Sequence, residues 1–132
     1  MADRPLNRIL YTDDEPDIRE VAKVSLELVG GFILCLCASG EEAVRMAPGF
    51  SPDLILLDVM MPGMDGTRTL AHLRTLGALA TTPVVFMTAK AQSAEQKRYR
   101  ELGAIDVIAK PFQPMQLPQQ LRDIWERINS AH

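Results

Sequence analysis

The chain has 132 residues, 47% of them hydrophobic, which is typical of one soluble globular domain with a single core. Its net charge is −3, from 17 acidic and 14 basic residues without a block of like charge, and this argues against direct binding of nucleic acid. The sequence has neither an apolar run long enough for a membrane span nor an N-terminal signal peptide. We therefore expect a cytoplasmic protein that does not contact membranes.

Short apolar runs alternate with segments of helical periodicity along the whole chain. The runs predict strands at residues 8–12, 32–37, 54–58, 83–88 and 106–110, and the periodic segments predict helices at 16–30, 39–47, 66–77, 93–103 and 118–128. The strands are continuously apolar, as in a parallel sheet that helices cover on both faces. The predicted fold class is therefore α/β, with a single doubly wound, five-stranded parallel sheet flanked by five helices.

Individual residues predict how the helices begin, end and pack. Ser39 is a candidate N-cap, Ser93 and Gln96 form a capping-box pattern, and Gly77 is a candidate helix stop. Pro118 predicts that the last regular helix starts close to it. In the first helix, the positions that recur at helical spacing are Ile18, Val21, Ala22, Ser25, Leu28 and Val29, and we expect this face to be buried.

Cys35 and Cys37 alternate on the second predicted strand, so both side chains should point to the same face of the sheet. Neither a Cys-x-x-Cys pair nor a cluster of histidines accompanies them. We expect two reduced, buried thiols rather than a redox pair or a metal site.

Polar residues collect where four of the predicted strands end. The first strand runs into Thr12, Asp13, Asp14 and Glu15, the third ends at Asp58, the fourth at Thr88 and Ala89, and the fifth at Lys110. In a parallel sheet these ends lie on one edge, where open α/β folds bind ligands. Each residue alone could be a turn or helix cap, but their coincidence at four strand ends favours a shared pocket.

Three aspartates in one pocket repel one another unless a cation joins them. Carboxylate oxygens suit Mg²⁺, which takes one or two carboxylates together with a phosphoryl group. Lys110 can meet an anion, and the Thr88 hydroxyl can donate a hydrogen bond to one. This set of groups indicates phosphoryl transfer in which an aspartate becomes an acyl phosphate.

Four motifs, DDEPD (13–17), LILLDVMMPGMDG (54–66), VVFMTAK (84–90) and GAIDVIAKPF (103–112), resemble those of the receiver domain of bacterial two-component response regulators. The resemblance spans about residues 6–128 and includes the chemotaxis regulators. It implies a flavodoxin-like fold with strand order 2-1-3-4-5. It also leads us to expect that residues 1–132 form a single, stand-alone receiver domain without an output domain.

The resemblance implies a metal site and a phosphorylation site. Asp58 would be the phosphoacceptor. Mg²⁺ would be bound by Asp14, Asp58 and the backbone carbonyl of Met60, while Asp13 would ligate it directly or through water.

The resemblance also assigns roles to the ends of the fourth and fifth strands. Lys110 would pair with the phosphoryl oxygens or, before phosphorylation, with Asp58. Thr88 would hydrogen-bond the phosphoryl group and change position on activation, and the small Ala89 would leave the pocket open. The Lys110–Pro111 peptide bond is expected to be cis.

By this resemblance the chain is a switch that catalyses only its own phosphorylation and dephosphorylation. A sensor histidine kinase or phosphotransfer protein would donate the phosphoryl group, and an unknown downstream protein would read the result. The protein would be a monomer or a phosphorylation-dependent dimer.

Two other functions stay open at this point. The chain could be the receiver of a longer transcription factor or hybrid kinase, which changes the output and leaves the chemistry intact. It could also be a Mg²⁺-dependent phosphatase of the haloacid dehalogenase type. Those enzymes carry an Asp-x-Asp signature, whereas the position two after Asp58 is Met60, which cannot transfer a proton.

Two positions depart from the family pattern. An aromatic residue often lies three positions before the lysine, where this chain has Val107, and the variable position two after the threonine is Lys90. Valine is short and restricted at its first torsion, so it cannot swing as an aromatic side chain does. We expect activation without an aromatic rotation, with the segment after Thr88, residues 89–97, as the moving part.

Overall fold

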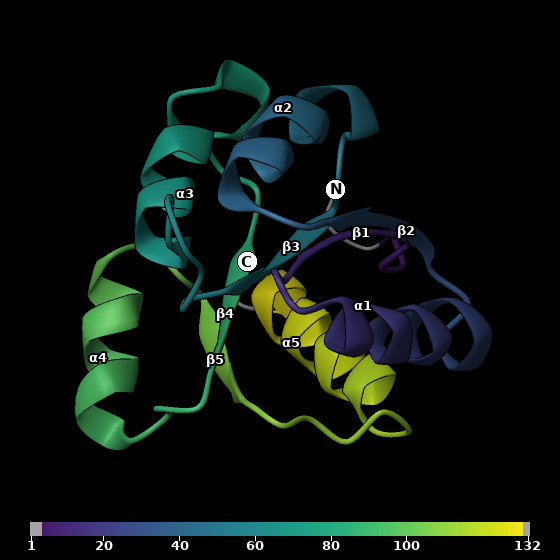
Figure 1. Cartoon of the computed structure of the whole chain (residues 1–132). Coiled ribbons are helices and arrows are strands. Elements are labelled where there is room, and N and C mark those ends of the chain that lie inside the picture. Colours follow the sequence, from purple (N-terminus) through teal and green to yellow (C-terminus); the bar gives the residue numbers. More distant parts are fainter. Residues whose placement is uncertain (1–3, 131–132) are drawn as a thin grey trace.

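The computed structural model describes residues 4–130 as one parallel sheet covered by helices (Figure 1). The strands are β1 (Arg8–Thr12), β2 (Ile33–Cys37), β3 (Leu54–Asp58), β4 (Val84–Thr88) and β5 (Asp106–Ala109). Their order in the sheet is β2-β1-β3-β4-β5, and every pairing is parallel. The predicted doubly wound α/β fold and its strand order are confirmed.

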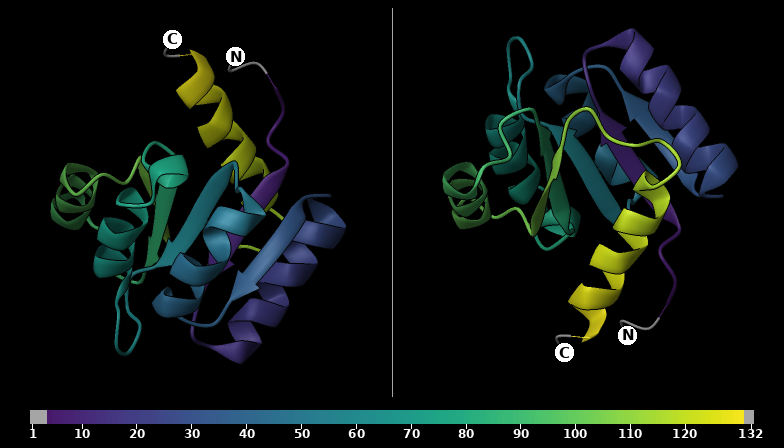
Figure 2. Two further views of the ribbon diagram at one scale, coloured as in Figure 1. Left: turned by 90° about the horizontal axis from the view of Figure 1, so that it is seen from above. Right: turned by 90° about the horizontal axis from the view of Figure 1, so that it is seen from below.

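Helices cover both faces of the sheet (Figure 2). They are α1 (Pro16–Lys23), α2 (Gly40–Phe50), α3 (Gly66–Arg74), α4 (Ser93–Glu101) and α5 (Leu117–Ser130), with a π-helix η1 (Val24–Val29) and a 3-10 turn η2 (Gly77–Leu79). One apolar cluster joins the sheet to α2, α3 and α4, and a second joins it to α1, η1 and α5. Across residues 4–130, no helix has the length and apolar character that a membrane crossing requires.

The register of the sheet brings the carboxyl ends of its strands to one edge. Thr12 pairs with Leu57, Asp58 with Met87, and Thr88 with Ala109. The strands β3 and β4 are buried along their whole length, which explains why their sequences are continuously apolar. The sheet is therefore a rigid support that ends in polar groups.

The predicted buried face of the first helix is confirmed only in part: Ala22 and Ser25 are buried and Ile18 packs against the core, whereas Val21, Leu28 and Val29 are exposed. Val21 and Leu28 are 40% and 79% exposed, whereas Ala22, Ser25 and Leu26 are buried. The chain changes from an α-helix to a π-helix at Val24, and the wider turn shifts the positions that face the sheet. Buried Ser25 donates a hydrogen bond to the carbonyl of Pro114 in the loop before α5.

Two of the predicted helix ends are confirmed. Ser39 caps α2, because its hydroxyl accepts a hydrogen bond of 3.0 Å from the Glu42 N–H. The last helix begins at Leu117, so Pro118 lies in its first turn, where a missing N–H costs nothing.

Two other predicted helix ends are wrong. The N-cap of α4 is Gln92 rather than Ser93, and no side chain caps this helix. The Gln96 side chain instead donates to a backbone carbonyl of the preceding loop, at 2.7 Å. Helix α3 already ends at Arg74, and Gly77 begins the 3-10 turn that follows.

The cysteines are free thiols, as predicted. Cys37 is buried in the apolar cluster under α2 and α3, as predicted, whereas Cys35 is only half-buried and packs against that cluster. Burial raises the pKa of the Cys37 thiol, and the nearby Cys35 raises it further. Both thiols therefore serve as packing groups on one face of the sheet.

Candidate functional site

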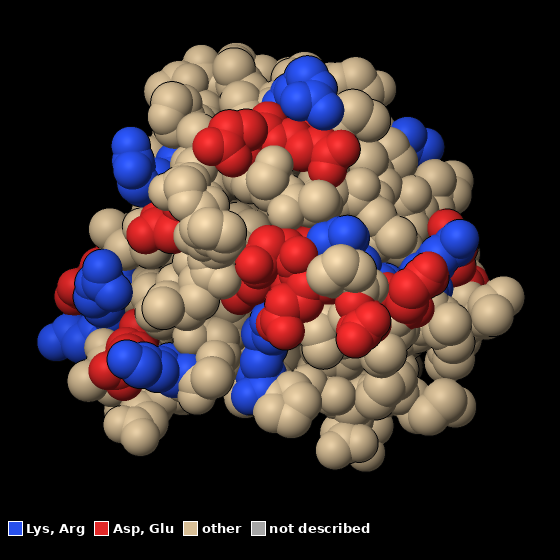
Figure 3. Space-filling view, in the orientation of Figure 1, with Lys and Arg blue, Asp and Glu red and all other residues tan. Residues whose placement is uncertain are grey.

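Three carboxylates converge at the carboxyl edge of the sheet. Asp13 follows β1, Asp58 ends β3, and oxygen atoms of Asp13, Asp14 and Asp58 all lie within 4.8 Å of one another. Asp13 is fully buried, Asp58 is 2% exposed, and Asp14 is half-buried. In Figure 3, acidic side chains gather across the middle of the face in view. The predicted clustering of the three aspartates is thus present in the structure.

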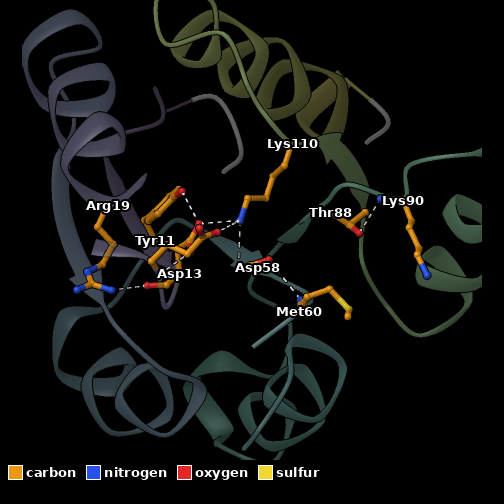
Figure 4. A network of polar contacts seen from close by, with 9 residues as sticks. Tyr11, Asp13, Arg19, Asp58, Met60, Thr88, Lys90 and Lys110 are labelled. Carbon is orange, nitrogen blue, oxygen red and sulfur yellow. Dashed lines mark hydrogen bonds and ion pairs between the residues drawn. The ribbon is translucent and has the colours of Figure 1, made fainter. Parts of the chain in front are cut away.

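Lys110 is the counter-charge of this cluster (Figure 4). Its Nζ lies 3.1 Å from Asp13 Oδ2, 3.3 Å from Asp58 Oδ2 and 3.5 Å from Glu15 Oε1. The Lys110–Pro111 peptide bond is cis, as predicted. One ammonium group therefore faces several carboxylates, and the cluster keeps an excess of negative charge.

Asp13 is held by groups that the sequence analysis did not single out. The Tyr11 hydroxyl donates to Asp13 Oδ2 at 3.2 Å, and the Glu15 N–H donates to Oδ1 at 3.0 Å. Arg19 donates to the backbone carbonyl of Asp13 at 2.7 Å. Tyr11 was missed because it lies inside an apolar strand, but its spacing of two from Asp13 places both side chains on the same face.

Burial and charge shift the pKa values of the cluster. Burial, with the charge of Asp13 as the second cause, raises the pKa of Asp58 to about 6, although Lys110 opposes the shift. Burial also raises the pKa of Tyr11, and Asp13 adds to this effect. For Lys110, burial alone would lower the pKa, but the hydrogen bond to Asp13 and the charge of Asp58 outweigh it and the pKa rises. These directions describe a pocket that favours added positive charge.

The raised pKa of Asp58 predicts how the metal-free protein responds to pH. A carboxylic acid whose pKa is higher in the folded state stabilises the fold when it is protonated, and this contribution is lost as the pH rises through about 6. Asn at this position cannot ionise. The stability of Asp58→Asn relative to the wild type should therefore increase between pH 4 and pH 8, by about 2 kcal/mol.

Urea unfolding of both proteins in EDTA at several pH values measures this difference. A stability difference that stays constant across this range would show that Asp58 ionises as easily in the folded protein as in the unfolded chain.

The remaining predicted residues lie at the border of the cluster. The Met60 N–H donates to Asp58 Oδ1 at 3.3 Å, while the Met60 side chain is 68% exposed. Thr88 is buried, and its hydroxyl accepts a hydrogen bond of 3.0 Å from the Lys90 N–H. Ala89 is exposed and carries only a methyl group. Figure 4 shows the Thr88 hydroxyl joined to Lys90, away from Lys110.

The donor atoms of the three aspartates suit a hard divalent cation. All three side chains offer oxygen, the donor that Mg²⁺ prefers, and their oxygens are close enough to share one ion. The like charges at the edge of a buried pocket are incompletely balanced by Lys110. A bound cation would remove this imbalance, so the residues present fit Mg²⁺.

The loop after Asp58 returns closely to the strand end because Gly66 has no side chain. A Cβ at Gly66 would lie 2.5 Å from the Asp58 carbonyl oxygen and 2.8 Å from Val59 Cα, both backbone atoms that cannot move aside easily. We expect Gly66→Ala to lower the free energy of unfolding by about 2 kcal/mol or more. Gly77→Ala is the matched control, since its Cβ would have no neighbour within 4 Å.

Urea unfolding of the two alanine variants tests this prediction. If Gly66→Ala and Gly77→Ala are equally stable, the loop does not depend on the close approach at Gly66.

Comparisons with known proteins agree on one family. The family model of the response regulator receiver domain matches residues 9–122. The chain is 37% identical over 122 residues to the phosphate regulon transcriptional regulatory protein PhoB of Escherichia coli, covering 92% of this chain and 53% of PhoB. It is 33% identical over 124 residues to the probable transcriptional regulator ycf27 of Guillardia theta, covering 94% of this chain and 47% of that protein. The chain thus spans about half the length of the curated relatives it matches.

Solved structures show the same architecture. The Vibrio cholerae chemotaxis protein CheY4 matches with a TM-score of 0.83 and 27% identity, over 90% of this chain and 98% of that one. The signal receiver domain of a signal transduction histidine kinase from Syntrophus aciditrophicus matches with a TM-score of 0.78 and 33% identity, over 92% of each chain. A chemotaxis protein and the receiver domain of a histidine kinase therefore share this fold.

Proposed function

This chain belongs to the response regulator receiver domains, and from that premise we propose that it accepts a phosphoryl group on Asp58 from a sensor histidine kinase or a histidine phosphotransfer protein. The observation that carries the proposal is the contact of Lys110 with both Asp13 and Asp58 at the carboxyl edge of the sheet. This contact places the Lys110 ammonium group beside the buried Asp58 carboxylate, where it could pair with the phosphoryl group after transfer. The switch would act through a protein partner that distinguishes the two states.

The chemistry is a transfer between a nitrogen and an oxygen. An Asp58 oxygen attacks the phosphorus of the donor's phosphohistidine, the phosphorus–oxygen bond forms and the phosphorus–nitrogen bond breaks. The imidazole leaves with the bonding electron pair and takes up a proton. Mg²⁺ bound by Asp13, Asp14, Asp58 and the Met60 carbonyl would supply positive charge to the transferred oxygens.

The other residues around Asp58 bind the transferred phosphoryl group or leave room for its donor. Lys110 leaves its pairing with Asp58 and Asp13 to meet a phosphoryl oxygen, so its charge follows the transferred group. The Thr88 hydroxyl donates to another phosphoryl oxygen, for which it must turn away from the Lys90 N–H. The methyl group of Ala89 leaves room for the donor at the entrance.

Transfer of a phosphoryl group from a phosphorus–nitrogen bond can be tested without the native kinase. Phosphoramidate carries a phosphorus–nitrogen bond, as phosphohistidine does. With Mg²⁺ it should add one phosphoryl group to the protein, and with EDTA in place of Mg²⁺ it should add none. A protein that stays unlabelled under both conditions would reject the proposed function.

The phosphatase hypothesis gains no support from the structure. Such an enzyme needs a proton donor two residues after the nucleophile, and there the Met60 side chain is 68% exposed and carries no transferable proton. Relatives such as PhoB are regulators by name. We therefore propose that the only reactions catalysed are phosphorylation and dephosphorylation of this chain itself.

A second candidate concerns the output. Curated relatives of which the chain covers about half are transcriptional regulators by name. The same receiver chemistry would then control transcription through a further part of a longer protein. The sequence of the gene beyond the codon for residue 132 tests this: an open reading frame that continues into another domain supports the longer regulator, and a stop codon there rejects it.

A further inference from the structure

Tyr11 places a hydroxyl group on an otherwise apolar face of the sheet. The residue is fully buried on β1, an inner strand, where it pairs in register with Leu36 of β2 and Leu56 of β3. Its ring packs in the apolar cluster that joins the sheet to α1, η1 and α5. A phenylalanine ring would fill the same space, whereas a buried hydroxyl needs a hydrogen-bond partner. The packing therefore does not require the hydroxyl, and its contact with Asp13 points to another role.

The partner of the hydroxyl is the Asp13 carboxylate, whose two oxygens both accept hydrogen bonds (Figure 4). Oδ1 accepts from the Glu15 N–H at 3.0 Å, and Oδ2 accepts from the Tyr11 hydroxyl at 3.2 Å and from Lys110 Nζ at 3.1 Å. Asp13 is fully buried, so these donors fix the direction in which each oxygen points. Because Asp13 belongs to the proposed Mg²⁺ ligands, its orientation bears on metal binding.

The two donors to Oδ2 differ in how firmly they are placed. Tyr11 lies two residues before Asp13 on an inner strand, so the sheet itself sets the distance between the hydroxyl and the carboxylate. Lys110 follows β5, and its Nζ is shared with Asp58 at 3.3 Å and with Glu15 at 3.5 Å. Tyr11 is therefore the donor that stays in place when Lys110 is drawn to another anion.

The two donors also differ in charge. A Mg²⁺ ion and the Lys110 ammonium group are both positive, so they compete for the same carboxylate. The Tyr11 hydroxyl is neutral and can stay on Asp13 beside a bound cation without repelling it. Residues that hydrogen-bond to metal ligands orient them, and their loss lowers metal affinity by about 10–100-fold. The Tyr11 hydroxyl has the position and the charge of such a group.

We propose that the Tyr11 hydroxyl is a positioning group, which orients the Asp13 carboxylate for Mg²⁺ and remains its partner when Lys110 turns to the phosphoryl group. The inference rests on the proposed function, in which Asp13 binds the metal directly or through water and Lys110 follows the transferred group. Tyr11 acts through Asp13 and touches neither the metal nor the phosphoryl group.

Titration calorimetry of Tyr11→Phe with Mg²⁺ tests the proposal in the full chain. The variant keeps the ring and loses the hydroxyl, so its Mg²⁺ affinity should be lower by about tenfold. Tyr99→Phe is the matched control, because Tyr99 is the other tyrosine of the chain and is buried in the other apolar cluster. This control should bind Mg²⁺ like the wild type. Wild-type affinity of Tyr11→Phe would overturn the proposal even if that variant were less stable, since a loss of stability alone reports a structural role.

The same substitution in a Lys110→Ala background tests whether the hydroxyl acts on Asp13 directly. Without Lys110, Tyr11 is the remaining side-chain donor to Asp13 Oδ2 among residues 4–130. Loss of its hydroxyl should again lower the Mg²⁺ affinity, by about tenfold or more. If the effect disappears in this background, the hydroxyl acts through Lys110 and the proposal is wrong.

Ultraviolet difference absorption gives a readout that does not require Tyr11→Phe to fold. The chain has two tyrosines, so Tyr99→Phe leaves Tyr11 as its single tyrosine. Saturating Mg²⁺ changes the charge around the carboxylate that the hydroxyl contacts, and it should shift the tyrosine absorption of this variant. Circular dichroism shows whether each variant is folded. An unchanged tyrosine band of folded Tyr99→Phe at saturating Mg²⁺ would also overturn the proposal.

Intact-mass measurement after treatment with acetyl phosphate and Mg²⁺ separates this proposal from the proposed function. If the wild type takes up no phosphoryl group, the proposed function fails, and the Mg²⁺ affinities still decide the role of Tyr11. If the wild type takes up one group while Tyr11→Phe binds Mg²⁺ with wild-type affinity, the proposed function stands and the role of Tyr11 is wrong.

Discussion

Replacing Asp58 by Asn should abolish the uptake of a phosphoryl group from acetyl phosphate in the presence of Mg²⁺. The amide has nearly the shape of the carboxylate but is a far weaker nucleophile, so the variant keeps the pocket and loses the attacking oxygen. In the wild type the Met60 N–H donates to Asp58 Oδ1 and Lys110 donates to Asp58 Oδ2, and the single amide oxygen of the variant can keep one of these two hydrogen bonds. Intact-mass spectrometry should show one added group on the wild type and none on the variant.

Asp17→Asn is the matched control for this experiment. Asp17 is an exposed aspartate in the first turn of α1, close in sequence to the cluster but outside it. The control should be labelled like the wild type. Labelling of Asp58→Asn at the wild-type rate would mean that another residue is the nucleophile.

Replacing Asp14 by Ala should weaken Mg²⁺ binding and stabilise the metal-free protein. Loss of a residue that hydrogen-bonds to a metal ligand lowers metal affinity by about 10–100-fold. Loss of a proposed ligand should therefore lower Mg²⁺ affinity by at least about tenfold. Without metal, an Asp14 oxygen lies within 4.8 Å of oxygens of Asp13 and Asp58, and the loss of Asp14 relieves the repulsion among these charges. Titration calorimetry with Mg²⁺ measures the affinity, and thermal melts in EDTA measure the stability.

Asp17→Ala controls for the loss of one acidic residue from the same region of the surface. It should bind Mg²⁺ like the wild type. A lower melting temperature of Asp14→Ala than of the wild type in EDTA would contradict the picture of crowded carboxylates. Unchanged Mg²⁺ affinity would remove Asp14 from the proposed ligand set.

The sheet was predictable because its strands carry a strong and simple signal. β3 and β4 are continuously apolar and completely buried, and each ends in a polar residue, Asp58 or Thr88. Parallel pairing then brings these residues to one edge, whatever the details of the helices. The same argument predicted that Asp13, Asp14 and Asp58 would meet.

The helices were less predictable because their details depend on tertiary contacts. The π-helix that begins at Val24 buries Leu26 and leaves Leu28 and Val29 exposed, and a regular periodicity of 3.6 residues cannot reveal such a shift. Ser93 and Gln96 have the spacing of a capping box, yet α4 begins one residue earlier than that pattern requires.

The groups that support the site were hidden for a different reason. Tyr11 reads as an apolar strand residue, and only the structure shows its hydroxyl on Asp13. Arg19 lies on α1 among other charged residues, and no sequence pattern indicates that its side chain donates a hydrogen bond to the Asp13 carbonyl. Sequence spacing can thus propose the reacting carboxylates, while the groups that orient them require coordinates.

The most direct test of the central claim is to locate the phosphorylated residue. Borohydride reduces an aspartyl phosphate to homoserine, a stable product that can be found by peptide sequencing in a mass spectrometer. After treatment with acetyl phosphate and Mg²⁺, the peptide that contains residues 54–66 should carry homoserine in place of Asp58. Homoserine at Asp13, Asp14 or any other aspartate, with Asp58 unmodified, would contradict the account.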